Sequence, residues 1–291
     1  MRSSRKLAMA SRQRGFSLVE LVVVLTIVGL LAGMAVTMVT RVAAAQQDTR
    51  SRLVLATAAD AALTRIADEV QAALPNSLRL TTNAEGVWLE WVPVLDAGRY
   101  RAASDTVAAA PGDVLDLNDP SDNAFDLIGA AVGTPAGSPP AGTSLVLQNM
   151  GTPEADAYAG SSRRDNAVLS AAGRHVAFVA AGAWPASTST QRFFLVATPV
   201  TLACIASAGG LFDLVRYSGY GWRAAQPASL GSAAWSGATR ALLLGGLGSC
   251  SASYSNALAN IGIVNLRLGL GLAGSGAAMS FMQQIALDNT P

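Results

Sequence analysis

Hydrophobic positions are concentrated near the beginning of the chain. Leu21 to Val39 form nineteen consecutive positions that are interrupted only by Thr26 and Thr37. At about 1.5 Å per residue, a helix of this length matches the roughly 30 Å hydrocarbon core of one bilayer. The pattern therefore predicts a single membrane-spanning helix.

A different pattern follows in residues 46–74. Apolar residues recur there at spacings of three and four, which predicts an amphipathic helix with one apolar stripe. The stripe consists of Leu55, Ala59, Leu63, Ile66, Val70 and Ala73/Leu74. We expect Pro75-Asn76 to end the helix. The sequence thus predicts one helix from Phe16 to Leu74, with its second half against a globular head.

Short segments rich in valine, leucine and aromatic residues make up the rest of the pattern, and turn residues separate them. We expect strands at Val87–Leu95, Ser144–Asn149, His175–Ala180, Arg192–Val200, Leu211–Tyr217, Arg240–Leu244, Ile263–Leu270 and Ala278–Leu287. Residues 102–110 and 130–142 are predicted low-complexity loops. The fold class is therefore α+β, a long N-terminal helix packed on an antiparallel β-rich head.

The distribution of charge predicts how the helix is oriented in the membrane. The 291 residues are only 13% charged, and the five basic residues before the apolar run (Arg2, Arg5, Lys6, Arg12 and Arg14) have no acidic residue among them. A basic N-terminus of this kind is expected to stay in the cytoplasm, so the head is expected on the other side of the membrane. Without residues 1–15 the chain has fifteen basic and nineteen acidic residues, a net charge of −4. This balance argues against a nucleic-acid partner, which clustered basic residues would attract.

Three interpretations compete for residues 1–45. A secretory signal would be cleaved near Ala43-Ala44-Ala45, but its apolar stretch would be unusually long. A plain membrane anchor explains the length and the orientation but gives Glu20 no purpose. That carboxylate stands at the start of the apolar run, and a charge placed in lipid costs on the order of 3 kcal/mol.

The third interpretation rests on the string from Arg14 to Leu21, RGFSLVEL. It resembles the processing motif of type IV prepilins and of the pseudopilins of type II secretion: a basic leader, a glycine, an aromatic residue, a glutamate at mature position five and an apolar helix. The resemblance implies that a prepilin peptidase cleaves between Gly15 and Phe16 and methylates the Phe16 amine. It also implies assembly with other major and minor pilins, and contact with an inner-membrane assembly platform.

The same resemblance implies a role for Glu20. In the family this glutamate is thought to contact the charged amine of a neighbouring subunit's first residue. A lone carboxylate in an apolar environment would otherwise be neutralised or expelled, so a pairing of this kind gives it a partner and sets the axial register. A glutamate that reaches back to the membrane interface is the simpler alternative.

Cys204 and Cys250 are the two cysteines of the chain. An exported head lies in an oxidising compartment, where two cysteines form one disulfide more readily than they remain free thiols. We therefore expect a Cys204–Cys250 bridge, which would stabilise the head by roughly 3–4 kcal/mol in the chain-entropy model.

The head carries a looser resemblance to the MshO family, large minor pilins of the mannose-sensitive haemagglutinin (MSHA) system. The similar segments are LEWVPV followed by Gly98-Arg99-Tyr100, Val200 to Cys204 with the later Leu214–Tyr217, and the closing QIALDNTP. They cover about a third of the head. Minor pseudopilins with similarly large heads are the nearest alternative family.

Residues typical of catalysis or cofactor binding are few. His175 is the only histidine and lies in an apolar segment, and no Gly-x-Ser-x-Gly elbow accompanies any serine. With one histidine and two distant cysteines a zinc site is not expected. The segment from Gly269 to Gly274 formally matches G-x-G-x-x-G, but it lacks a following helix, so we interpret it as a glycine-rich strand and turn. The sequence predicts no enzyme activity and no cofactor.

One acidic segment is a weak calcium candidate. Its oxygen-bearing side chains are Asp113, Asp116, Asn118, Asp119, Asp122 and Asn123, with Asp116, Asn118, Asp119 and Asp122 as the candidate ligands. The spacing lacks the EF-hand pattern, and such clusters usually form turns. A turn is the favoured interpretation.

These patterns and resemblances predict a minor pilin of an MSHA-like type IV pilus. Its expected parts are a leader (1–15), a membrane half-helix (16–40), an amphipathic half-helix (41–75) and a β-rich head (76–291). It is expected to cross the inner membrane once, with a periplasmic head, and then to join the pilus, with a tip or initiation role suggested by the head's size. A minor pseudopilin of type II secretion and an exported soluble or anchored binding protein are the alternatives.

Overall fold

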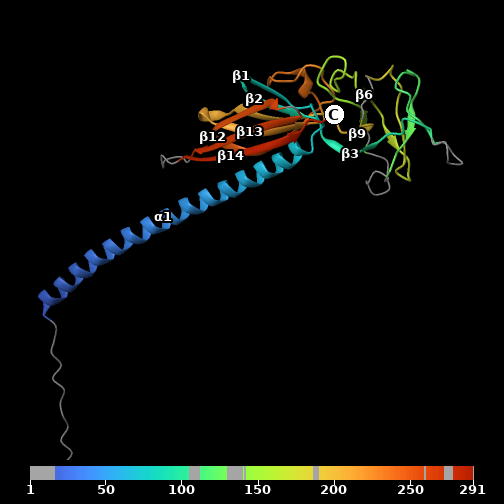
Figure 1. Ribbon diagram of the computed structural model, residues 1–291. Coiled ribbons are helices and arrows are strands. Elements are labelled where there is room, and N and C mark those ends of the chain that lie inside the picture. Colours follow the sequence, from blue (N-terminus) through green and yellow to red (C-terminus); the bar gives the residue numbers. More distant parts are fainter. Residues whose placement is uncertain are drawn as a thin grey trace, which may run out of the picture. The chain divides into compact units, whose positions relative to one another are not determined.

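We analysed a computed structural model of the chain (Figure 1), which describes residues 17–104, 112–129, 140, 142–185, 190–258, 260–271 and 278–290. The chain divides into two compact units, Met1–Val54 and Leu55–Pro291. The first unit is helical where it is described, and the second combines the end of the same helix with all the strands. The predicted α+β class is confirmed.

The helix α1 spans Leu18–Gln71, 54 residues. It ends three residues before the predicted Leu74, because the backbone N–H of Leu74 donates to the carbonyl of Val92 (2.8 Å) rather than to its own helix. Pro75 contributes to this end, since the residue before a proline avoids the helical conformation. Asn76 then adopts a left-handed φ of 57°, which asparagine tolerates better than most residues.

The predicted apolar stripe is confirmed in the second unit. Ala59, Leu63, Ile66 and Val70 are buried in one hydrophobic cluster with the inner face of the largest sheet. On the flank of this contact Glu69 accepts from Arg216 of the sheet (3.0 Å) and from Arg65 one turn earlier (3.0 Å). The stripe is therefore the surface by which the helix packs on the head.

The largest sheet has seven antiparallel strands in the order β1-β2-β10-β11-β12-β13-β14. Their bounds are β1 Arg79–Asn83, β2 Gly86–Trp91, β10 Val200–Ala206, β11 Phe212–Ser218, β12 Thr239–Leu258, β13 Ile261–Gly271 and β14 Ala278–Asp288. Together with residues 55–71 of α1 these strands form what we call the sheet lobe. Residues 219–238, which include the 3₁₀ turn η2 (Ala233–Trp235), carry a second, aromatic cluster on the outer face near β2, β10 and β11.

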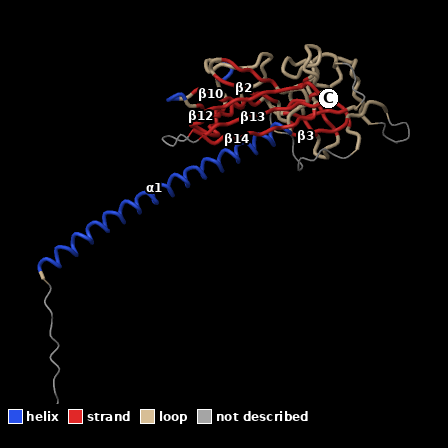
Figure 2. Tube along the Cα trace, turned by 60° about the vertical axis from the view of Figure 1, so that its left-hand side comes forward, coloured by secondary structure: helices blue, strands red, loops and turns tan. Residues whose placement is uncertain are grey.

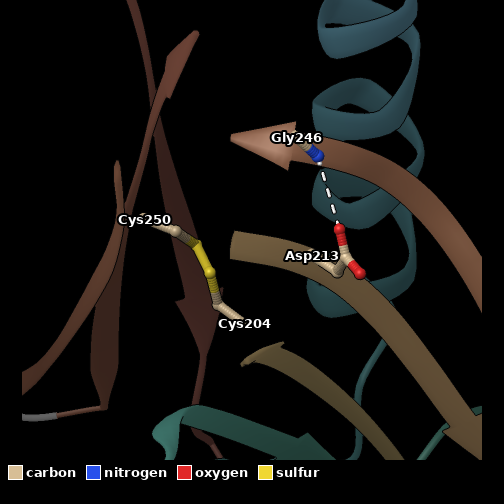
Figure 3. Close-up of a disulfide and its surroundings, with 4 residues drawn as sticks. All are labelled: Cys204, Asp213, Gly246 and Cys250. Carbon is tan, nitrogen blue, oxygen red and sulfur yellow. Dashed lines mark hydrogen bonds between the residues drawn. A yellow bond between two sulfur atoms is a disulfide. The ribbon is translucent and has the colours of Figure 1, made fainter. Parts of the chain in front are cut away.

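The longest strand, β12, is irregular at its centre. Gly246 has a positive φ of 72°, and its backbone N–H donates to the Asp213 carboxylate of β11 (3.3 Å; Figure 3). Pairing with β11 ends at Leu247, and the strand continues beside β13 alone. Glycine suits this position because other residues rarely adopt such a φ. The sequence prediction of a short strand at Arg240–Leu244 missed this continuation.

A second lobe is inserted between β2 and β10. It is the segment Val94–Val196, which we call the insertion lobe. It contains two small sheets, ordered β3-β9-β5-β6 and β4-β8-β7. The strands are β3 Val94–Arg99, β4 Ala124–Asp126, β5 Ser144–Val146, β6 Arg163–Arg164, β7 Val168–Leu169, β8 His175–Ala177 and β9 Arg192–Val196. Figure 2 shows how much of this lobe is loop.

Two predicted strands are wrong in one respect, because each is split between the two lobes. The predicted strand Val87–Leu95 divides at Val92-Pro93 into β2 and β3, and Arg192–Val200 divides into β9 and β10. The two breaks lie side by side, since the backbone N–H of Ala197 donates to the carbonyl of Pro93 (3.0 Å). A proline cannot donate to the ladder, which favours a break at such a position.

Three asparagines tie the end of the helix to both lobes. The Asn76 side-chain amide donates to the carbonyls of Asn149 in the insertion lobe (3.0 Å) and of Asn289 near the C-terminus (3.1 Å). Asn149 in turn donates to the carbonyl of Pro75 (2.8 Å). The helix therefore enters the head at a point fixed by hydrogen bonds from distant parts of the chain.

Candidate assembly segment and polar sites of the head

The first turn of α1 is capped by Ser17. The backbone N–H of Glu20 donates to Ser17 Oγ (3.2 Å), and that of Leu21 donates to the Ser17 carbonyl (3.2 Å). Serine at this position satisfies backbone donors that a helix start leaves unpaired. Gly15 and Phe16, the predicted processing site, lie outside the described residues.

Glu20 lies in this first turn with an exposed side chain. A carboxylate is favoured there, because the helix dipole is positive at its N-terminal end. No described group forms a hydrogen bond or an ion pair with this carboxylate. Within the part of the chain that the structure describes, the Glu20 carboxylate is therefore unpaired.

The apolar side chains that follow are exposed on every side of the helix. Among the most exposed are Leu18 (78%), Leu30 (67%), Met34 (68%) and Met38 (70%). By length and composition this helix is able to cross a membrane. A surface of this kind requires lipid or other helices around it.

The threonines within the apolar run are compatible with that environment. Thr26 donates its hydroxyl to the carbonyl of Val23 (2.8 Å), and Thr37 donates to that of Met34 (2.8 Å). Both polar groups are thereby satisfied inside the helix, which is what a hydrocarbon environment demands.

Cys204 of β10 and Cys250 of β12 are joined by a disulfide (Figure 3). Their Cα atoms are 6.3 Å apart, although β11 separates the two strands in the sheet order. The bridge forms where β12 has passed the end of β11, and Cys204 is buried in the cluster that α1 covers. It therefore fastens the second half of β12 to the centre of the sheet lobe.

A buried ionic network in the sheet lobe was missed by the sequence analysis. Glu90 of β2 is fully buried and accepts from Arg79 Nε of β1 (2.8 Å) and from the Tyr220 hydroxyl (2.7 Å). Burial raises the pKa of the Glu90 carboxyl, and the nearby Arg79 opposes this rise. The sequence does place a glutamate between the apolar residues Leu89 and Trp91. Both faces of that strand are covered, so a glutamate there is buried and needs polar partners.

The network continues towards the insertion lobe through stacked side chains. The Arg79 guanidinium lies over the Tyr158 ring (3.5 Å to the centroid), and Arg163 lies over the Trp222 ring (4.1 Å). Tyr158 and Trp222 contact each other edge to face, with centroids 6.1 Å apart. Tyr158 also donates its hydroxyl to the Ser77 carbonyl (2.8 Å). This stack joins the two lobes, and burial raises the pKa of the Tyr158 hydroxyl.

The acidic segment forms turns through its own side chains. Asp116 accepts from the backbone N–H of Asn118 (2.9 Å), Asp119 from that of Ser121 (2.8 Å) and Asp122 from that of Asp116 (2.6 Å). Among the described residues, no three His, Cys, Asp or Glu side chains are grouped so as to hold a metal ion. The geometry fits the turn interpretation.

His175 pairs with an aspartate at the surface of the insertion lobe. Its Nδ1 lies 2.9 Å from Asp126 Oδ1 and 3.9 Å from Asp113 Oδ2, and its side chain is 41% exposed. Asp126 also accepts from the backbone N–H of Asp113 (2.9 Å), and this bond, followed by the one with His175, lowers the pKa of the Asp126 carboxyl. The pair links β4 and β8.

Comparison with known families identifies one part of the chain. Residues 10–36 match the model of the prokaryotic N-terminal methylation motif, a range that includes Gly15, Phe16 and Glu20. The match supports the type IV pilin and pseudopilin superfamily, whose members are structural proteins processed by a prepilin peptidase. Together with the apolar helix it is consistent with anchoring in the inner membrane. No curated protein and no solved structure is significantly similar to the chain.

Proposed function

We propose that this chain is a minor pilin of an MSHA-like type IV pilus. It is cleaved between Gly15 and Phe16, methylated on the Phe16 amine and assembled through its N-terminal helix. The observation that carries the proposal is the methylation motif at residues 10–36, continued by a helix that exposes apolar side chains all round. The MSHA assignment rests on the head segments that resemble MshO.

In this proposal the chain has no enzymatic activity, and its working surface is the helix. Residues 16–40 cross the inner membrane, residues 41–75 carry the helix onto the head, and residues 76–291 form a periplasmic head that later joins the pilus. Glu20 pairs with the methylated amine of an adjacent subunit. In an apolar bundle this pair sets the register, because an unpaired charge there is costly.

The test is the mass and N-terminal sequence of the protein purified from its membrane. A mature chain that begins at methylated Phe16 is the expected result. A chain that begins at Gln46 would support a secreted binding protein instead. Retention of residues 1–15 would contradict processing and with it the whole proposal.

The role of Glu20 is tested by Glu20→Ala, with Glu154→Ala, an exposed carboxylate of the insertion lobe, as the matched control. We expect normal cleavage of both variants and loss of filament incorporation for Glu20→Ala alone. Filaments that contain the Glu20 variant at the normal level would remove its proposed role.

A minor pseudopilin of type II secretion is the second candidate, because the same N-terminal motif is found in that family. Deletion of the gene separates the two functions: loss of surface pili supports the pilin, and loss of protein secretion supports the pseudopilin. Immunogold labelling along the filament then tests the proposed tip position, which even labelling would contradict.

A further inference from the structure

A polar cavity of about 230 Å³ lies where the end of the helix meets both lobes of the head. Its lining comes from four segments: the residues after α1, β1, the insertion lobe and β12. The polar members of the lining are Asn76, Arg79, Asp156, Tyr158, Tyr254 and Asn256. Pockets for drug-sized ligands usually measure about 300–1,000 Å³, so this cavity suits a smaller molecule or one unit of a longer one.

Hydrogen bonds within the protein hold this lining in place. Tyr158 donates its hydroxyl to the carbonyl of Ser77 (2.8 Å). The Asn76 side-chain amide donates to the carbonyl of Asn289 (3.1 Å), and the Asn289 side-chain amide donates to the Tyr254 hydroxyl (3.3 Å). A site that is ordered before binding loses little conformational entropy when a ligand enters, which favours a small ligand with few contacts.

Arg79 brings a positive charge to the cavity, but most of its donors are already used. Its Nε and Nη2 donate to Glu90 Oε2, and the charge of this buried carboxylate balances that of the guanidinium. Nη1 donates to the carbonyl of Ala224 (2.6 Å), and Nη2 donates to that of Arg223 (3.1 Å). Four of the five guanidinium N–H groups are thus engaged. An anion would gain one donor at most, and the Asp156 carboxylate would repel it.

A cationic ligand is also disfavoured. The guanidinium of Arg79 repels it, and the same guanidinium already covers a face of the Tyr158 ring (3.5 Å to the centroid), where a cation would otherwise bind. Trp222 contacts that ring edge to face. Asp156 is the single carboxylate of the lining as the structure describes it, and one carboxylate is too few for a metal ion. The charges around the cavity therefore favour a neutral ligand.

Three side chains of the lining keep hydrogen-bonding capacity within the described part of the chain. Asp156 accepts from the backbone N–H of Tyr158 through Oδ1 (2.8 Å), and its Oδ2 has no partner there. The Tyr254 hydroxyl accepts from Asn289, which leaves its own proton to donate. The amide of Asn256 is exposed and is able to donate and to accept. A ligand with several hydroxyl groups matches this set, because each hydroxyl is both a donor and an acceptor.

Leu78 and Met150 add apolar surface to the lining, and Met150 is 44% exposed. A sugar ring needs both kinds of surface, because it has hydroxyl groups around its edge and C–H groups on its faces. We propose that the cavity binds one neutral sugar residue. Its hydroxyl groups contact Asp156, Tyr254 and Asn256, and its C–H groups contact Met150. This inference concerns the head alone and does not depend on the proposed function.

The test uses the full-length protein in a detergent without a sugar headgroup, and it measures binding by saturation-transfer NMR. The neutral probes are the methyl glycosides of glucose, galactose, mannose and N-acetylglucosamine. Glucuronic acid and glucosamine serve as an anionic and a cationic probe of similar size. Comparison of the three kinds of probe tests the class of ligand directly.

Two variants test the location of the site. Asp156→Asn keeps an acceptor for the backbone N–H of Tyr158 but replaces the free oxygen by a donor, and Asn256→Ala removes the exposed amide. Ser253→Ala is the matched control, because Ser253 is exposed on the opposite face of the same strand. An unchanged midpoint of thermal unfolding shows that each variant is folded.

We expect at least one neutral glycoside to bind. Asp156→Asn and Asn256→Ala should each raise its dissociation constant about fivefold, the effect of one lost hydrogen bond, and Ser253→Ala should leave it within twofold. Both charged probes should bind more weakly than the neutral glycoside. Absence of binding by all four glycosides, or tighter binding of a charged probe, would overturn the choice of ligand. Equal binding to the native protein and to both cavity variants would overturn the location of the site.

Discussion

The sheet lobe and the insertion lobe are stabilised in different ways. The sheet lobe has strands of up to twenty residues, a covering helix and a disulfide. The insertion lobe has strands of two to six residues, and its core is built from aromatic rings around Phe125. Long ladders distribute stability over many backbone bonds, whereas a lobe of short strands depends on a few large side chains. We therefore expect single core substitutions to disturb the insertion lobe more.

The largest expected effect is that of Phe125→Ala. Phe125 is fully buried, and its ring lies 5.2 Å from that of Phe193 and 6.0 Å from that of Tyr100. Loss of this ring should destabilise the insertion lobe by about 3–5 kcal/mol. Hydrogen exchange measured by mass spectrometry should rise in β4 and β8 and stay unchanged in β13. Val168→Ala, at an exposed position of the same lobe, is the control, and equal exchange in both lobes would contradict their independence.

Removal of the disulfide should destabilise the sheet lobe rather than the insertion lobe. The double variant Cys204→Ser/Cys250→Ser frees a loop of 46 residues, which corresponds to about 3–4 kcal/mol in the chain-entropy model. Urea unfolding should show a lower midpoint, and exchange should increase in β12 before it increases in β8. Reduction of the native protein should reproduce the effect, and an unchanged midpoint in both samples would show that the bridge adds no stability.

Tyr158→Phe tests the contact between the lobes. The change keeps the ring beneath Arg79 but leaves the buried Ser77 carbonyl without its donor, at a cost of about 1–3 kcal/mol. Exchange should increase at the junction in both lobes, since the bond crosses between them. Tyr158→Leu, which also removes the ring, should have a larger effect. An equal effect of the two variants would assign the whole contribution to the hydroxyl.

The smallest expected effect concerns the Asp126–His175 pair. The pKa of Asp126 is lowered from an ordinary value of 3.8, so its contribution to stability is present above that value and is lost as the pH falls through the folded-state pKa. The pair is partly exposed to solvent, so the contribution is at most about 1 kcal/mol. Asp126→Asn should flatten the pH dependence of the insertion lobe below pH 3.8 in thermal unfolding. A variant with the native pH profile would contradict this assignment.

The sequence predicted those parts of the fold whose signal is local. The helix stripe from Ala59 to Val70 repeats at the helical period, and the apolar run is continuous, so both could be recognised without knowledge of their neighbours. The second half of β12 carries no such signal. Its serines and glycines form a strand because β13 and the disulfide hold them there.

The candidate site likewise has one part that the sequence predicts and one part that it does not. A short motif and a run of apolar residues define the candidate assembly segment, residues 16–40, and neither signal depends on tertiary structure. The Glu90 network depends on Arg79, Tyr220 and Tyr158, which come together only when β1, β2 and the insertion lobe are in place. A lone glutamate in a strand gave no indication of these partners. The partner of Glu20 is proposed to lie in another chain, so its pairing stays a prediction.

The adjacent breaks at Pro93 and Ala197 show how the insertion lobe is attached to the sheet lobe. More than a hundred residues leave the sheet lobe and return to it through two neighbouring strands, β2 and β10. A short turn can therefore replace that whole excursion without altering the order of the remaining strands. The insertion lobe is therefore a module that leaves and re-enters the sheet lobe at one place, and we expect its length and content to vary without a change to the sheet that carries it.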